Sequence, residues 1–184
     1  MRKWTTLKTT QQPTTPDVLD GYWTSAHTTY RLRFHLVWVP KYRRRVLEEP
    51  VATRLTHLLR QACEVNRWGL EELNIQADHV HLLLQVSPKD SVMNVMQTLN
   101  GGTARVLRTE FPGLVEYLWG ESFWSDGYFA ETVCQTQEAI LRAYIRNQGL
   151  PSRFATANKQ NKQSYRSFSA DGNFSLIDFV DKFL

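Results

Sequence analysis

Hydrophobic positions along the chain change period several times, and each change predicts a new element. Within residues 30–39, Tyr30, Leu32, Phe34, Leu36 and Trp38 fall on one side and Arg31, Arg33 and His35 on the other, which is the period of a strand. Beyond Pro50 the apolar positions recur at helical spacing as far as about Asn66, which predicts an amphipathic helix. The same reasoning predicts, in chain order, strands at 70–76 and 79–86, a helix capped by Ser91 with a stripe from Val92 to Leu107, a strand at 127–133, and a helix at 136–148.

This order of elements is typical of an α+β fold with a ferredoxin-like split βαβ sheet, as in RRM and palm domains. We expect an antiparallel sheet with helices on one face and a further C-terminal helix. Gly101 and Gly102 interrupt the second helical stripe and indicate a kink or a close backbone approach. The folded domain is expected at 28–149, after a flexible polar arm at 1–27 and before an extension at 150–184 that contains a short amphipathic segment.

Composition changes this picture little. A net charge of +4 and a pI near 9.2 permit a nucleic-acid partner without requiring one. Cys63 and Cys134 lie far apart, outside any metal-ligand spacing, which fits a reducing compartment. No run approaches the ~18 apolar residues of a membrane span, and the N-terminus lacks the apolar core of a signal peptide. We therefore expect a cytoplasmic protein with no membrane partner.

The first candidate site is the motif Asp78-His79-Val80-His81. Alternate residues of a strand share a face, so His79 and His81 project together while Val80 and Leu82 face the core. Two imidazoles at one place suit a divalent metal ion. The alternative is two ordinary polar residues on a half-exposed strand, and the motif alone does not exclude it.

The second candidate site lies on the last predicted helix. Tyr144 and Gln148 are one helical turn apart and share a face beside Leu141 and Ile145, so both polar groups look toward protein. The alternative is a core tyrosine with a local hydrogen bond. Tyr128 is a rival nucleophile by residue type, but it lacks a partner four residues on like the Gln148 of Tyr144.

Taken together, five segments of the chain resemble the HUH-type single-tyrosine transposases, the TnpA proteins of the IS-two-hundred/six-hundred-and-five bacterial insertion sequences. The segments are FHLVWVPKYRRRVL, DHVHLLL, a long helix ending in RTEFP, LWGESFWSDGYFAETV and AYIRNQ, in this order between about Tyr30 and Gln148. Members of that family usually begin near the first strand and end soon after the tyrosine helix, so both tails here are departures from it.

The resemblance implies a role for each candidate residue. Tyr144 would be the nucleophile, on a catalytic helix, and His79, His81 and Gln148 would bind Mg²⁺ or Mn²⁺. The enzyme would cleave and rejoin single-stranded DNA at the ends of an insertion sequence through a 5′-phosphotyrosine, after recognising subterminal hairpins. It would be a homodimer whose tyrosine helix can serve the partner's active site.

Contacts to single-stranded DNA are expected from basic and aromatic side chains together. The candidates form a loop after the first strand and a pair on the second helix: Lys41, Tyr42, Arg43, Arg44, Arg45, Arg105 and Arg108. For each of them a solvated basic surface is the alternative. Trp119, Phe123 and Trp124 are read as core or interface residues.

Other functions fit the motifs less well. Histidine-triad hydrolases need a further histidine where Leu83 stands, and two-histidine phosphoesterases need a second H-x-[ST] motif, which His27-Thr28-Thr29 supplies only outside the folded pattern. A non-catalytic or domesticated ferredoxin-like protein that binds single strands remains the alternative function, to be distinguished by metal-independent binding without cleavage.

Overall fold

The computed structural model describes residues 21–25, 27–118 and 122–146. Contacts divide the chain into two units, 1–31 and 32–184. The first contains an antiparallel hairpin of β1 (Trp23–Ser25) and β2 (Thr28–Tyr30), in which the rings of Trp23 and Tyr30 meet edge to face with centroids 6.3 Å apart. Strand β1 lies in the segment predicted to be a flexible arm, and its three residues are too few to show a period in the sequence.

The second unit is built on an antiparallel sheet. Its strands are β3 (Leu32–Trp38), β4 (Gly69–Gln76), β5 (His79–Val86) and β6 (Phe129–Thr132), in the spatial order β4-β5-β3-β6. This order, with a helix after β3 and another after β5, is the ferredoxin-like split βαβ arrangement, so the predicted fold class is confirmed. The two central strands, β3 and β5, position the residues described below.

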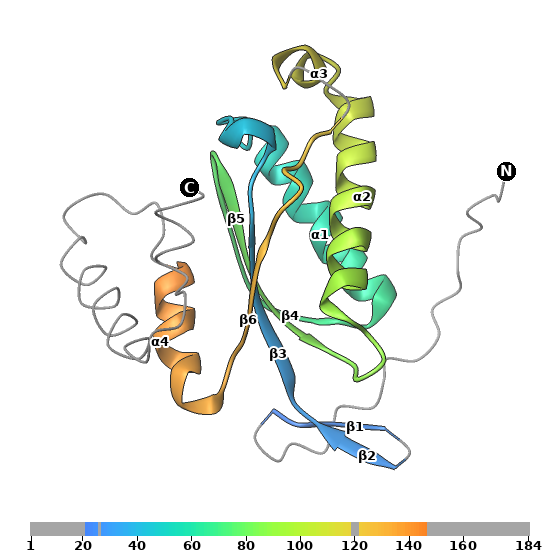
Figure 1. The fold of residues 1–184 in the computed structure, drawn as a ribbon, viewed down its shortest axis with the longest axis vertical. Coiled ribbons are helices and arrows are strands. Elements are labelled where there is room, and N and C mark those ends of the chain that lie inside the picture. The colour runs from blue at the N-terminus through green and yellow to red at the C-terminus, as the bar shows by residue number, and fades with distance from the viewer. Residues whose placement is uncertain (1–20, 26, 119–121, 147–184) are drawn as a thin grey trace, which may run out of the picture. The chain divides into compact units, whose positions relative to one another are not determined.

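Two helices cover one face of the sheet (Figure 1). They are α1 (Val51–Asn66) and α2 (Val92–Glu110). A short helix that was not predicted, α3 (Gly113–Tyr117), follows α2. Helix α1 buries Val51, Leu55, Leu59 and Cys63, one residue from each turn, against the apolar face of the sheet. The alternating residues of β3 and β5 that point this way, among them Leu36, Trp38, Val80, Leu82 and Leu84, complete the main core.

Helix α2 begins as its sequence predicts. The Ser91 side-chain oxygen accepts a hydrogen bond from the backbone N–H of Asn94 at 3.2 Å. It continues as one helix from Val92 to Glu110 through both glycines, so the predicted kink is absent from the described structure. A Cβ added to Gly101 or Gly102 would meet no atom within 4 Å, and both glycines are exposed. The alternative expectation, a close backbone approach, is also wrong within the described residues.

The last helix, α4 (Gln135–Arg146), packs on the opposite face of the sheet (Figure 1). Its buried residues Leu141, Tyr144 and Ile145 form a second core with Val37, Val39 and Leu83. Val37 and Leu83 alternate with the strand residues of the main core, so the same two strands supply both cores. The sheet therefore separates two hydrophobic clusters, the large main core on the face of α1 and α2 and the small second core on the face of α4.

Ion pairs join α4 to the edge strand β4. Arg142 contacts Glu71 at 2.7 Å and Glu138 at 2.9 Å, and Arg146 pairs with Glu72. A bulge in β4 between Leu70 and Glu72 interrupts the alternation, which lets these two consecutive glutamates both reach arginines of α4. Burial raises the pKa of Glu71 despite its arginine neighbours. The network specifies where α4 sits along the sheet.

Candidate active site

Successive side chains of β5 point to opposite faces of the sheet, and this alternation positions the two histidines of the site. Val80, Leu82 and Leu84 enter the main core, and His79 and His81 point to the opposite face, toward α4. The two imidazole rings lie edge to face with centroids 4.9 Å apart. The His79 side chain retains 13% exposure and His81 none, so the pair is more buried than the half-exposed strand of the alternative interpretation.

Helix α4 brings the predicted nucleophile to the same place. Tyr144 is 2% exposed, and its ring meets His81 edge to face with centroids 5.8 Å apart. The structure thus joins two motifs that are more than sixty residues apart in the chain. Gln148, the predicted third metal ligand, lies outside the described residues. Tyr128 packs against the main core, on the other face of the sheet.

Hydrogen bonds and burial set the protonation of the two histidines. His79 Nδ1 lies 2.8 Å from Asp78 Oδ1, yet burial lowers the pKa of His79 against the effect of this carboxylate. Complete burial lowers the pKa of His81 well below its ordinary value, helped by its two histidine neighbours. Although burial alone would raise it, the pKa of Asp78 lies below its ordinary value because His79 and Arg43 stabilise its charge. Both imidazoles are therefore neutral near pH 7.

Two residues of this site were not predicted as part of it. His35 Nε2 lies 3.0 Å from His81 Nδ1, and His35 Nδ1 lies 3.0 Å from Glu131 Oε1. The alternation of β3 had placed His35 on the right face, but the register that pairs β3 with β5 and β6 was needed to find its neighbours. Pairing register depends on contacts far apart in the sequence, which is why the pattern alone did not reveal them.

Comparison with known proteins identifies the family to which the chain belongs. The family described as "Transposase IS200 like" matches residues 28–148, which is most of the chain. The chain belongs to the IS200-like transposase family.

Individual members support the assignment. The ISDra2 transposase TnpA of Deinococcus radiodurans is 35% identical over 119 residues, which are 65% of this chain and 85% of that protein. The transposase of insertion sequence IS200 of Salmonella typhimurium is 33% identical over 67% of this chain and 80% of its own length. A crystal structure assigned as a transposase from Deinococcus radiodurans R1 superposes with a TM-score of 0.58 and 34% identity, covering 70% of this chain and 98% of that one.

The donor set of this transposase fits a divalent cation. His81 Nε2 is buried with no hydrogen-bond partner, which leaves a ring nitrogen for a ligand, and the neighbouring His79 is neutral as well. Within the described residues no group of three or more His, Cys, Asp or Glu side chains forms a metal site. Any further protein donor must therefore be another residue type or lie outside the described ranges.

The basic loop lies beside this pair of histidines. A 3-10 turn, η1 (Lys41–Arg43), follows β3, and Arg43 donates a hydrogen bond to Asp78, the same carboxylate that holds His79. Arg44 lies over the ring of Tyr117 at 5.0 Å, and Lys41 contacts Asp126 at 3.5 Å. These partners order the loop. Two of the predicted DNA contacts stay strongly exposed, Tyr42 at 64% and the Arg45 side chain at 72%.

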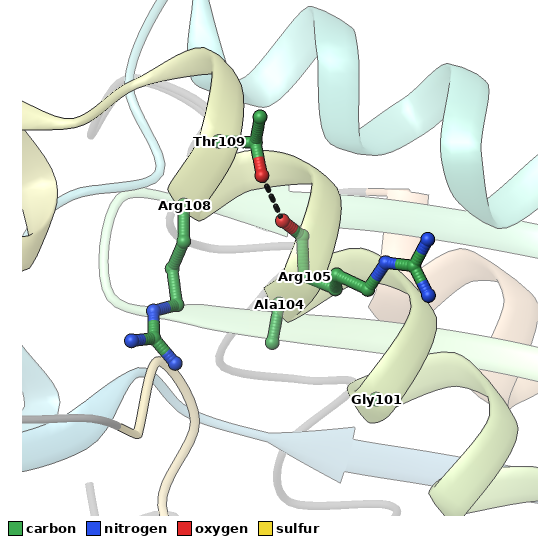
Figure 2. A pocket seen from close by; sticks show the side chains of 5 residues that line it. All are labelled: Gly101, Ala104, Arg105, Arg108 and Thr109. Carbon is green, nitrogen blue, oxygen red and sulfur yellow. Dashed lines mark hydrogen bonds between the residues drawn. The ribbon is translucent and has the colours of Figure 1, made fainter.

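The other predicted DNA contacts, Arg105 and Arg108, lie on α2 and so on the face of the sheet opposite the histidines. With Gly101, Ala104 and Thr109 they line an open hollow of about 450 Å³ (Figure 2). The structure separates this pair from the candidate active site. Of the aromatic cluster, Phe123 and Trp124 are buried in the main core, as expected, and Trp119 lies outside the described residues. No described helix is long and apolar enough to cross a bilayer.

Proposed function

We propose that this IS200-like transposase cleaves and rejoins single-stranded DNA at the ends of an insertion sequence through a 5′-phosphotyrosine at Tyr144. The observation that carries the proposal is the contact between the Tyr144 and His81 rings, made by a helix and a strand remote in sequence. A nucleophile next to two neutral imidazoles is an arrangement suited to phosphoryl transfer. We expect the enzyme to act in the bacterial cytoplasm, where its DNA substrate is found.

The reaction needs no external energy. The Tyr144 oxygen would attack the scissile phosphorus and lose its proton, and the bond from phosphorus to the 3′ oxygen would break. The leaving oxygen would take up a proton, giving a free 3′-OH and a 5′-phosphotyrosine. Attack by another 3′-OH would reverse these steps, so that strands are exchanged with the number of phosphodiester bonds conserved.

A tyrosine hydroxyl is a weak nucleophile at neutral pH because its pKa is near ~10. We propose that His79, His81 and Gln148 hold Mg²⁺ or Mn²⁺ at the site. When bound, the ion would polarise the scissile phosphate and neutralise the charge that develops there. Two imidazoles and an amide carry no net charge, so we expect weak binding of the ion until DNA is present.

For DNA binding we propose subterminal hairpins as ligands, held by the loop from Lys41 to Arg45. This loop supports the proposal because Arg43 joins it to Asp78, directly beside His79. Arg105 and Arg108 would contact a part of the DNA away from the scissile phosphate. A homodimer with shared active sites stays a prediction from the family resemblance; within one chain, Tyr144 already contacts His81.

The test is to incubate the protein with labelled single-stranded hairpin DNA and Mg²⁺ or Mn²⁺. A denaturing gel would detect a covalent adduct, and mass spectrometry would locate it. We expect an adduct at Tyr144 that EDTA prevents and that His79→Ala removes. Tight, metal-independent binding with no adduct on any hairpin would instead support the non-catalytic binding protein. An adduct at another tyrosine would contradict the assignment of Tyr144.

A further inference from the structure

A row of polar side chains crosses the sheet behind His81. It runs from His81 on β5 to His35 on the central strand β3 and then to Glu131 on β6. His35 and His81 are both fully buried, whereas the Glu131 side chain is 29% exposed. Burying two imidazoles in a sheet is costly unless their nitrogens are paired, so the pairing within this row stabilises both rings.

The Glu131 carboxylate at the outer end of the row determines which ring nitrogens donate and which accept hydrogen bonds. An ionised glutamate accepts hydrogen bonds and donates none, so His35 must place a hydrogen on Nδ1 to satisfy Glu131. If this Nδ1 hydrogen is the only one on the His35 ring, His35 Nε2 accepts, and His81 must donate from Nδ1. The His81 Nε2 lone pair is thereby left available, and this is the ring atom that is buried with no hydrogen-bond partner.

Ring packing reinforces the arrangement. The planes of His35 and His81 are within 11° of parallel, with ring centroids 5.3 Å apart. Phe129 meets His35 edge to face with centroids 6.1 Å apart, and Tyr144 meets His81 in the same manner at 5.8 Å. Neither imidazole can turn over without breaking a hydrogen bond of this row.

We propose that His35 and Glu131 are positioning residues that fix His81 in the tautomer with hydrogen on Nδ1 and a free lone pair on Nε2. Asp78 would do the same for His79 from its own side of the site. The effect of this tautomer on cation binding rests on the proposed metal-dependent function. The assignment of the tautomer itself does not. Partners of this kind around a metal-binding histidine contribute 10–100-fold to metal affinity in known sites.

The first experiment observes the tautomer in the metal-free protein. Long-range ¹H–¹⁵N NMR on protein labelled in its histidine rings distinguishes a protonated from an unprotonated ring nitrogen. We expect wild-type His81 to be protonated at Nδ1 alone, and Glu131→Gln to give a mixture, because an amide can donate as well as accept. A wild-type His81 protonated at Nε2 would overturn the proposal.

The second experiment measures Mn²⁺ affinity by electron paramagnetic resonance in the presence of hairpin DNA. We expect Glu131→Gln and His35→Gln each to weaken binding about 10–100-fold. The matched control is Glu116→Gln, the same change on the exposed face of α3, which should leave affinity unchanged. The double variant should be no weaker than the worse single variant, because both belong to one row.

These outcomes distinguish an effect of Glu131 that passes through His35 from an effect of its negative charge alone. If Glu131 acted only through its negative charge, His35→Gln would keep wild-type affinity, and that result would overturn the proposal. Thermal melting identifies variants that lose structure; Glu131 is partly exposed, so its variant keeps the test valid if His35→Gln does not fold. A wild-type protein that binds no Mn²⁺ would instead refute the metal-dependent function, with the NMR result unaffected.

Discussion

Leu141→Ala should loosen the tyrosine helix without unfolding the rest of the domain. Leu141 is fully buried in the small core between α4 and the sheet, where its neighbours are Val37, Leu83 and Ile145. The main core lies on the other face and shares none of these side chains. The two faces can therefore lose stability separately.

The expected magnitude follows from the burial. Removing a fully buried leucine side chain costs about 2–5 kcal/mol, according to how far the surroundings collapse. A loss of about 3 kcal/mol would raise the undocked fraction of α4 about 150-fold. The ion pairs of Arg142 and Arg146 with β4 are partly exposed, so each contributes little. The buried Arg33 also pairs with Glu138 of α4, and the substitution leaves that pair in place. Cleavage should fall because Tyr144 leaves His81 whenever α4 undocks.

Hydrogen exchange followed by mass spectrometry is the direct assay. In Leu141→Ala, amides of α4 should exchange much faster, while those of α1 and β5 should change little. The matched control is Leu59→Ala, an equally buried leucine of α1 in the main core, which should lower the midpoint of global unfolding instead. If Leu141→Ala accelerated exchange equally in α1 and α4, the two cores would unfold as one unit and the reasoning would be wrong.

Four further outcomes are expected. Tyr144→Phe should abolish the covalent adduct yet cost only about 1 kcal/mol of stability, because the ring remains buried; any adduct formed by this variant contradicts the mechanism. Arg45→Gln should weaken hairpin binding and reduce the slope of log K against log salt by about 0.7, and an unchanged slope would remove Arg45 from the interface. In EDTA, the free energy of unfolding should fall as pH drops below 6.5, because burial lowers the pKa of His81 and the unfolded chain binds the proton first. In urea titrations the fall should approach about 1.4 kcal/mol per pH unit from His81, with a further contribution from His79, whose pKa is also lowered. A flat profile would show that His81 is charged when folded. Burial raises the pKa of the Cys63 thiol to about 12, so iodoacetamide should modify the exposed Cys134 first in native protein, as read by peptide mass spectrometry.

The local pattern was enough to find most elements of the domain. Period and capping predicted α1, α2, α4 and the four strands of the sheet to within a few residues. The hairpin of β1 and β2 and the single turn-like helix α3 were missed, because elements of three to five residues have no measurable period. The glycine pair in α2 does not interrupt the helix, since a helix of nineteen residues tolerates two glycines.

The sequence by itself determined which side chains share a face: the alternation of β5 pairs His79 with His81, and helical spacing sets Tyr144 beside Leu141 and Ile145. These are local relations, fixed by the backbone periods of a strand and a helix. Only the tertiary structure decided that the face carrying Tyr144 meets the face carrying His81, that His35 and Glu131 stand behind His81, and that Arg105 and Arg108 lie on the opposite face of the sheet. Those relations depend on strand register and on which face of the sheet each helix covers, and both are set by burial between residues far apart in the chain.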